Sequence, residues 1–323
     1  MKKVYFDSAA TTQLRDDVIS CITEVLKTEY GNPSSTHSYG RSSKSLLENA
    51  RKEIAKLLNV SASEIIFTSG GTEADNLILC SAVRDLGVKR IISSRIEHHA
   101  VLHTLEWLKK EYDIVLDFVK IDECGQVDYD HLKNLLADTS QKTLVSLMHV
   151  NNEIGSLLDL KKVAVLCKEH HALFHSDTVQ SVGHYELDFK DIPIDFAAAA
   201  AHKFHGPKGA GFAFIRKNSG LRSLIHGGEQ ERGLRAGTEA VYAIAGMAEA
   251  LKLSYHKLEK ERAYITELKD YFKEQLLTAI PGVKFNGSCD DNARSTYTLL
   301  NVCLPISAEK AMLLLFQLDL KGI

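Results

Sequence analysis

The chain alternates short apolar runs of strand length with longer amphipathic stretches that have the spacing of helices. The pattern predicts strands at residues 64–68, 90–93, 114–119, 143–149, 172–177, 195–199 and 211–215. It predicts helices from Thr72 onward and at residues 100–110, 129–136 and 160–170. Repeated strand–helix alternation is typical of βαβ units, in which helices connect parallel strands. We therefore expect an α/β fold with a mostly parallel central sheet flanked by helices.

The last third of the chain departs from this alternation. Residues 240–277 have the pattern of a long helix with a break near Tyr255. After it come an extended stretch at 283–286, a strand at 296–303 and a helix at 308–317. One clear strand and one clear helix bury too little apolar surface for an independent core. We expect a large domain at residues 14–258 and a smaller α+β domain, incomplete here, that combines residues 1–13 with 259–323.

Composition and charge narrow the class of protein. Of the 323 residues, 45% are hydrophobic and 25% are charged, with a net charge of −3. No strongly basic stretch indicates a nucleic acid or an anionic membrane as a partner. The chain has neither an apolar run of about 18 residues nor an apolar segment behind its first lysines, so we expect no membrane span and no signal peptide. A cytoplasmic protein with a small-molecule substrate is the expectation.

The six cysteines are scattered along the chain, at positions 21, 80, 124, 167, 289 and 303. None belongs to a C-x-x-C pair, and a chain of this size does not need disulfide bonds for stability. We expect buried structural thiols.

Glycines follow the strand predicted at 64–68, in the run Thr68-Ser69-Gly70-Gly71-Thr72-Glu73. A helix N-terminus with free N–H groups, a close backbone approach and a hydroxyl at Thr72 suits a phosphate. The run has neither the Walker A pattern nor the Rossmann glycine spacing. The alternative is a glycine turn in which Thr72 only caps the helix.

His98 follows the strand predicted at 90–93, in the run EHHAV. A histidine at a strand end is a candidate acid or base, or a ring that stacks on a flat cofactor. The alternatives are an exposed polar side chain and a zinc site. A zinc site would combine His98 and His99 with three further histidines, at positions 170, 171 and 175.

Three further strand ends carry polar side chains. Asn152 lies in MHVNNEIG, and Asp177 with Gln180 lies in HSDTVQ, where a carboxylate could pair with a protonated ring nitrogen or cap the next helix. Lys203 follows a strand of small residues in AHKFHGPKG. A partly desolvated lysine there has a lowered pKa and can form a Schiff base, although most lysines in turns are simply exposed.

A glycine- and arginine-rich loop, HGGEQERGLRAGT at residues 226–238, precedes the long helix. It is a candidate for contacting an anion or another subunit. A solvated loop is the alternative.

The order of these motifs resembles the cysteine desulfurases of the NifS/IscS type, within the class V aminotransferase-like enzymes of fold type I. The matching segments cover essentially the whole chain: YFDSAATT, GNPSS, TSGGTEADN, EHHAV, MHVNNEIG, SDTVQSVG, AHKFHGPKG and HGGEQERGLRAGT. The resemblance implies the cofactor pyridoxal 5′-phosphate.

The resemblance also implies roles around the cofactor ring. Lys203 would bind the cofactor as a Schiff base and later move protons at the substrate α-carbon. His98 would stack over the pyridine ring and act as acid or base. Asp177 would keep the ring nitrogen protonated. Gln180 would bond the phenolic oxygen, with Asn152 nearby toward the substrate.

Further positions would hold the phosphate and the substrate. Gly71, Thr72 and His202 would hold the cofactor phosphate. Thr238 would reach the phosphate of the partner subunit in a homodimer. Asn32 is a candidate contact to the substrate.

The reaction implied is the conversion of L-cysteine to L-alanine. A cysteine thiolate of the enzyme takes the sulfur as a persulfide. A sulfur-acceptor protein, such as an iron–sulfur scaffold, then receives it for cluster or thio-cofactor synthesis.

The sequence departs from the family pattern in two places. Ala200 stands where the family usually has a serine that bonds the phosphate, and it lies beside Ala201 in the small-residue stretch expected against the cofactor. One lost hydrogen bond to a charged group weakens binding by roughly 1.5–3 kcal/mol. The second departure follows Leu318, where a strand-like approach to the family's catalytic loop ends at Ile323. We expect the chain as given to lack the nucleophilic cysteine and to be inactive in desulfuration.

Two alternatives to cysteine desulfuration stay open at this stage. One is another class V enzyme, an aminotransferase or a selenocysteine lyase. The other is a non-catalytic homologue that acts as a partner-binding subunit, which Ala200 and the short C-terminus favour.

Overall fold

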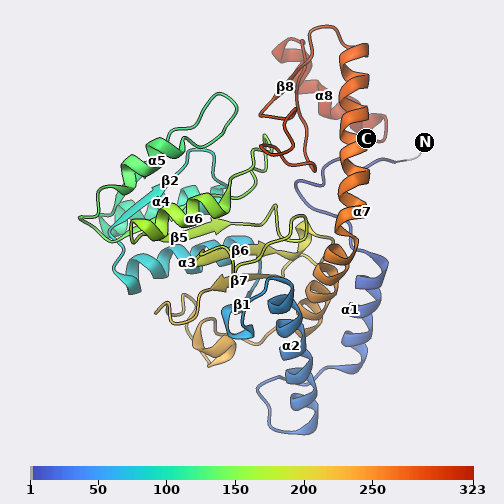
Figure 1. The fold of residues 1–323 in the computed structure, drawn as a ribbon. Helices are drawn as coiled ribbons and strands as arrows, with labels where there is room; N and C mark the ends of the chain where they lie inside the picture. Colours follow the sequence, from blue (N-terminus) through green and yellow to red (C-terminus); the bar gives the residue numbers. More distant parts are fainter. Residues whose placement is uncertain (1–2) are drawn as a thin grey trace.

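A computed structural model describes residues 3–323, which form an α/β body and an extension that carries the last elements of the chain (Figure 1). The helices are α1 Asp16–Thr28, α2 Ser38–Leu57, α3 Gly71–Leu86, α4 His99–Tyr112, α5 Tyr129–Leu136, α6 Leu160–Glu169, α7 Val241–Ala279 and α8 Ala308–Leu320. The strands are β1 Ile65–Thr68, β2 Arg90–Ser93, β3 Val115–Phe118, β4 Thr143–Ser146, β5 Leu173–Asp177, β6 Phe196–Ala200, β7 Gly211–Ile215, β8 Lys284–Asn286 and β9 Asn301–Cys303. Short 3₁₀ turns are η1 Ala62–Glu64, η2 Ala201–Lys203 and η3 Gln230–Gly233.

The central sheet has seven strands in the order β1-β7-β6-β5-β4-β2-β3. The pairs from β6 to β3 are parallel, whereas β7 runs antiparallel to both β6 and β1. The predicted α/β fold with a mostly parallel sheet is therefore confirmed.

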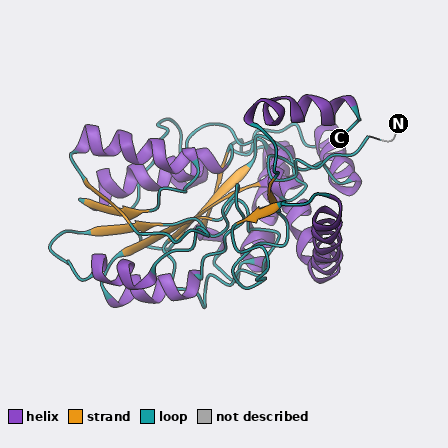
Figure 2. Cartoon of the chain, turned by 90° about the horizontal axis from the view of Figure 1, so that it is seen from above, coloured by secondary structure: helices purple, strands orange, loops and turns teal. Residues whose placement is uncertain are grey.

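Both faces of the sheet are buried under helices (Figure 2). Along β7, Phe212 and Phe214 pack in one core with apolar residues of α2, α6 and α7, whereas Ala213 and Ile215 pack in the other with those of α3 and α4. Successive side chains of a strand point to opposite faces, so a strand that is covered twice is mostly apolar. This is why the strands appear in the sequence as continuous apolar runs. β5 is the exception, because His175, Ser176 and Asp177 are buried where it approaches the site.

The predicted break in the long helix near Tyr255 is wrong, because α7 runs without interruption for 39 residues. No proline stands within it, and only proline or a comparable insertion breaks a helix sharply. Its first half is buried against the body, where the Ser254 hydroxyl donates to the Phe204 carbonyl at 3.3 Å. Its second half is mostly exposed and forms the stem of the extension (Figure 1).

The strand predicted at 296–303 is shorter in the structure and comprises only β9, Asn301–Cys303. The residues before it bond a loop of the body, since the Thr296 N–H donates to the Gly155 carbonyl at 2.8 Å. The pattern analysis assigned no element to residues 13–60, where the structure has α1 and α2. Within residues 3–323, no helix is long and apolar enough to cross a membrane.

Candidate active site

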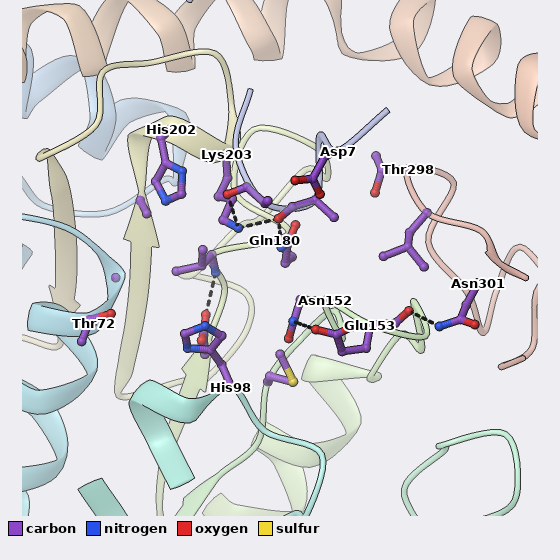
Figure 3. Close-up of a pocket in the computed structure, with 18 of the residues that line it drawn as sticks. Asp7, Thr72, His98, Asn152, Glu153, Gln180, His202, Lys203, Thr298 and Asn301 are labelled. Atoms are coloured by element: carbon purple, nitrogen blue, oxygen red, sulfur yellow. Dashed lines mark hydrogen bonds between the residues drawn. The ribbon is translucent and has the colours of Figure 1, made fainter. Parts of the chain in front are cut away.

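A cavity of about 740 Å³ opens at the carboxyl ends of the parallel strands, where ligands of α/β sheets usually bind (Figure 3). Four parts of the chain line it: the N-terminal segment, the strand-end loops, the start of α3, and the segment before and within β9. Its lining residues are Phe6, Asp7, Ala9, Ala10, Gly71, Thr72, Asp75, His98, Met148, Asn152, Glu153, Asp177, Val179, Gln180, Ala200, His202, Lys203, Thr298, Leu299, Leu300, Asn301 and Val302.

Most of the site residues expected from the sequence meet in this cavity. They are Gly71, Thr72, His98, Asn152, Asp177, Gln180, Ala200, His202 and Lys203. Ala201 is fully buried behind the lining. Asn32 and Thr238 are exposed residues that do not line this chain's cavity, and the Asn32 Oδ1 accepts a bond from the Ser34 N–H at 2.9 Å.

Lys203 is the last residue of η2, which directly follows the buried alanine strand β6. Its Nζ donates to the carbonyl of Ala9 and, at 3.0 Å, to that of Ala10. Burial lowers the pKa of the Lys203 amine, while the nearby carboxyls of Asp177 and Asp7 act in the opposite direction. A lowered pKa increases the fraction of neutral, nucleophilic amine.

Asp177 ends β5, and its side chain is buried at the cavity floor. Its Oδ1 accepts a bond from the Val179 N–H at 2.9 Å. Burial, together with the negative charge of Asp75, raises the pKa of Asp177 to about 7. A buried carboxylate of this kind favours a cation as its neighbour. Gln180 lies one turn further on, and its Nε2 donates to the Ala9 carbonyl at 2.9 Å.

The N-terminus of α3 opens onto the cavity at Gly71 and Thr72. A Cβ atom at Gly71 would come within 2.5 Å of the Val179 side chain, so only glycine fits there. The unpaired N–H groups of a helix N-terminus attract an anion.

His202 also lines the cavity. Burial is the main cause that lowers the pKa of His202 to about 4, and the positive charges of Lys203 and Lys208 add to the effect. The His202 ring is therefore neutral near pH 7.

His98 is the N-cap residue of α4, where its Nδ1 accepts a bond from the Ala100 N–H at 3.1 Å. This bond fixes the ring at the cavity wall and leaves the Nε2 side available to a ligand (Figure 3). The helix-capping role and the ligand-facing role of His98 are therefore compatible.

Several cavity residues were missed by the sequence analysis. Asp75 is a carboxyl on the buried face of α3, and its Oδ1 lies 3.3 Å from the Nε2 of the equally buried His175. A carboxyl among apolar helix positions was a usable signal for Asp75. On the other wall, the Asn301 Nδ2 donates to the Glu153 carbonyl at 2.9 Å and so joins β9 to a strand-end loop (Figure 3).

The histidines of the zinc alternative do not converge. Among residues 3–323, no group of three or more His, Cys, Asp or Glu side chains stands in a metal-binding arrangement. His175 instead bonds the Ser146 hydroxyl through Nδ1 at 2.9 Å.

Comparison with known proteins agrees with this architecture. Residues 4–318 match the family model described as aminotransferase class V. The cysteine desulfurase IscS of Dictyoglomus turgidum is 40% identical over 324 residues, which cover 100% of this chain and 80% of that protein. A putative cysteine desulfurase, IscS 1 of Bacillus subtilis, is 39% identical, and the match covers 100% of this chain and 84% of that protein.

Solved structures show the same relationship. A NifS-like protein superposes with a TM-score of 0.93 at 35% identity, covering 100% of this chain and 87% of the other. The NifS-like protein from Rickettsia africae superposes with a TM-score of 0.86 at 32% identity, covering 98% of this chain and 86% of the other. The chain therefore belongs to the class V aminotransferase family and, within it, to the cysteine desulfurases of the NifS/IscS type, which are pyridoxal-phosphate enzymes.

Proposed function

We propose that this protein binds pyridoxal 5′-phosphate in the cavity and converts L-cysteine to L-alanine, passing the sulfur to an acceptor protein. The observation that carries the proposal is that an amine, a carboxyl and an anion-binding helix N-terminus face one cavity. These groups are Lys203, Asp177 and the start of α3 at Gly71.

The residues present fit the cofactor. Asp177 is a buried carboxyl that favours a cationic partner, as a protonated ring nitrogen would be. The N-terminus of α3, with Thr72 and the neutral ring of His202, would hold the phosphate. When bound, the cofactor supplies an electron-accepting ring for bond cleavage at the α-carbon of an amino acid.

The protein's own groups then position the substrate and move its proton. Lys203 would hold the cofactor covalently, and its amine, when free, could take and return the α-proton. His98 stands at the opposite wall with one ring nitrogen used by the Ala100 N–H. Gln180 and Asn152 both line the cavity. Gln180 would donate toward the phenolic oxygen, and Asn152 would lie toward the substrate.

The cofactor assignment is tested by absorption spectroscopy and by mass spectrometry of the labelled peptide. Purified protein mixed with pyridoxal 5′-phosphate is expected to show a bound absorption band. Borohydride should fix the cofactor to the peptide that contains Lys203. Lys203→Ala should abolish this labelling, whereas Lys208→Ala, an exposed lysine of the same loop, should leave it intact. Labelling elsewhere, or none in the unchanged protein, would overturn the assignment.

We also propose a homodimer located in the cytoplasm. Support for the homodimer comes from Thr238, which is exposed and lies outside this chain's cavity. A side chain in that position could contact the phosphate bound by a second subunit. Sedimentation should give about twice the 35.8 kDa mass of one chain, and a monomer would contradict the proposal.

A further inference from the structure

The N-terminal segment lines the cavity, and its backbone carbonyls accept hydrogen bonds from two other lining side chains, Lys203 in η2 and Gln180 in the turn after β5. The carbonyl of Ala9 accepts bonds from both Lys203 Nζ and Gln180 Nε2. The carbonyl of Ala10 accepts a second bond from Lys203 Nζ at 3.0 Å. These contacts join residues more than 170 positions apart in the sequence (Figure 3).

Two side chains outside the cavity hold this segment in shape. The Tyr5 hydroxyl lies within bonding distance of the carbonyls of Asp7, at 2.9 Å, and Thr11, at 3.0 Å, and so ties the two ends of the turn together. The Thr12 Oγ1 donates to the His202 carbonyl at 2.9 Å and accepts from the His205 N–H at 2.7 Å. Thr12 thereby fixes the turn to the loop that carries Lys203.

The two carbonyls can fix the direction of the lone pair on the Lys203 amine. A neutral amine has two N–H donors and one lone pair. If both hydrogens point to the carbonyls of Ala9 and Ala10, the lone pair takes the remaining tetrahedral position, on the side of Nζ away from the turn. That side is the cavity, which Lys203 lines.

We infer that the carbonyls of Ala9 and Ala10 form a seat that orients the free amine of Lys203 for attack on the cofactor, and that Tyr5 and Thr12 are positioning residues that hold this seat. The inference rests on the proposed function, because it concerns the same lysine and cofactor. Both residues act through the turn, since neither lines the cavity.

The ionisable groups around Nζ are Asp177 at the end of β5, Asp7 in the turn and His202 beside the lysine. Burial lowers the pKa of the amine and the two carboxyls oppose this effect. Carbonyl oxygens also stabilise an ammonium ion, so loosening the seat should lower the pKa of the amine further. A weakened seat therefore has two signatures. Capture of the cofactor is slower at pH values above the midpoint, where the amine is neutral in every variant, and the pH midpoint of the rate moves downward.

The experiment measures capture of pyridoxal 5′-phosphate by cofactor-free protein, followed by absorbance from pH 6 to 10. In this reaction the amine forms a bond to the aldehyde carbon and one water is released. On the high-pH plateau of the rate, Tyr5→Phe and Thr12→Val should each slow capture by about threefold to tenfold, the effect of one or two lost hydrogen bonds. Each should also move the midpoint of the rate to lower pH.

Tyr264→Phe is the matched control, because Tyr264 is an exposed tyrosine on α7. A purely structural role for Tyr5 and Thr12 would lower the melting temperature without changing the capture rate or its midpoint. That result would overturn the inference. If Thr12→Val does not fold, Tyr5→Phe decides, since Tyr5 is 55% exposed and its loss should leave the fold intact. Failure of the unchanged protein to capture the cofactor would refute the proposed function instead.

Discussion

At the scale of single residues, Ala200 is the position where a small change should strengthen the site. It ends β6, is 2% exposed and lines the cavity beside Gly71. Ala200→Ser would add a hydroxyl on the side of the expected phosphate. A hydrogen bond to a charged group is worth about 1.5–3 kcal/mol, so the dissociation constant of pyridoxal 5′-phosphate should fall at least about tenfold.

Ala213→Ser provides the control for this substitution, because Ala213 is fully buried on the neighbouring strand β7, pairs there with Ile66 and Ala198, and does not line the cavity. There the new hydroxyl meets an apolar core and should destabilise the protein by about 1–3 kcal/mol without a gain in affinity. Fluorescence titration with the cofactor measures both variants. An unchanged affinity in Ala200→Ser would show that the phosphate lies elsewhere.

Asp177 should make the stability of the cofactor-free protein depend on pH. Its folded pKa of about 7 lies above the ordinary 3.8 of an aspartate, mainly because of burial. A carboxyl with a raised pKa contributes full stability below its unfolded pKa and loses that contribution as the pH rises through the folded value. The contribution of Asp177 to the free energy of unfolding of the cofactor-free protein should therefore fall as the pH rises from about 4 to about 7.

Asp177→Asn cannot ionise and should be more stable than the unchanged protein at pH 8, by an amount on the order of 1–4 kcal/mol, with the difference vanishing near pH 4. Urea unfolding across this pH range is the measurement. Asp270→Asn, on an exposed position of α7, should follow the unchanged protein. The prediction would be contradicted if the free energy of unfolding had the same pH dependence in Asp177→Asn and in the unchanged protein.

At the scale of elements, a buried ion pair joins α2 to the sheet edge and to the loop at 226–238. The Arg51 guanidinium donates to both carboxylate oxygens of Glu231, at 2.7 and 2.8 Å, and to the Ile65 carbonyl. Glu231 also accepts a bond from the Phe67 N–H of β1 at 2.8 Å. Glu231 itself has a left-handed backbone, with φ of 48°, which this pair helps to hold.

Glu231→Ala would remove the two-point carboxylate partner of the buried Arg51 guanidinium and leave it only Glu48, whose Oε1 accepts from Nε at 3.1 Å, and the Ile65 carbonyl. The free energy of unfolding should fall by up to about 3–5 kcal/mol. Asp191→Ala removes the exposed pair with Lys161 and should cost less than about 1 kcal/mol. Urea unfolding of both variants compares the two pairs directly. Equal losses would mean that the buried pair does not hold the loop.

At the scale of the whole molecule, the described residues bring no thiol to the cavity. None of the six cysteines lines it. Burial raises the pKa of the Cys80 thiol to about 11 and also raises those of Cys21, Cys167 and Cys289. The thiolate is the form that attacks sulfur, so these residues are poor acceptors.

We predict that the 323-residue chain binds the cofactor but releases no sulfide from L-cysteine in the presence of a reductant. The measurement is sulfide and alanine release, with exchange of the substrate α-proton as a sign of cofactor chemistry. Robust sulfide release by the 323 residues alone would refute the prediction. Amino-group transfer to a keto acid instead would favour an aminotransferase.

Two contacts join the N-terminal segment to the last elements of the chain. The Val4 N–H donates to the Gly322 carbonyl at 2.8 Å, and the rings of Phe6 and Phe272 stack at 6.2 Å. We propose that the described residues of the predicted small domain, 3–13 and 259–323, form a smaller unit on the stem of α7; residues 1 and 2 lie outside the described part of the chain. The same N-terminal segment continues into the cavity lining at Ala9 and Ala10, next to Lys203.

The sequence by itself determined the elements of the sheet and the chemistry at its strand ends. Periodicity indicates which positions are buried, and the carboxyl ends of parallel strands share one edge, so Thr72, His98, Asp177 and Lys203 were candidates for one site from the sequence. The resemblance to the cysteine desulfurases implied the role of each. Only the tertiary structure decided the continuity of α7, the Asp75–His175 contact and the wall at Asn301. It also decided the seat of Lys203, because the carbonyls of Ala9 and Ala10 reach that amine only when chain packing brings residues more than 190 positions apart into contact. Backbone carbonyls leave no trace in residue identity, which is why no pattern in the sequence could have predicted their role.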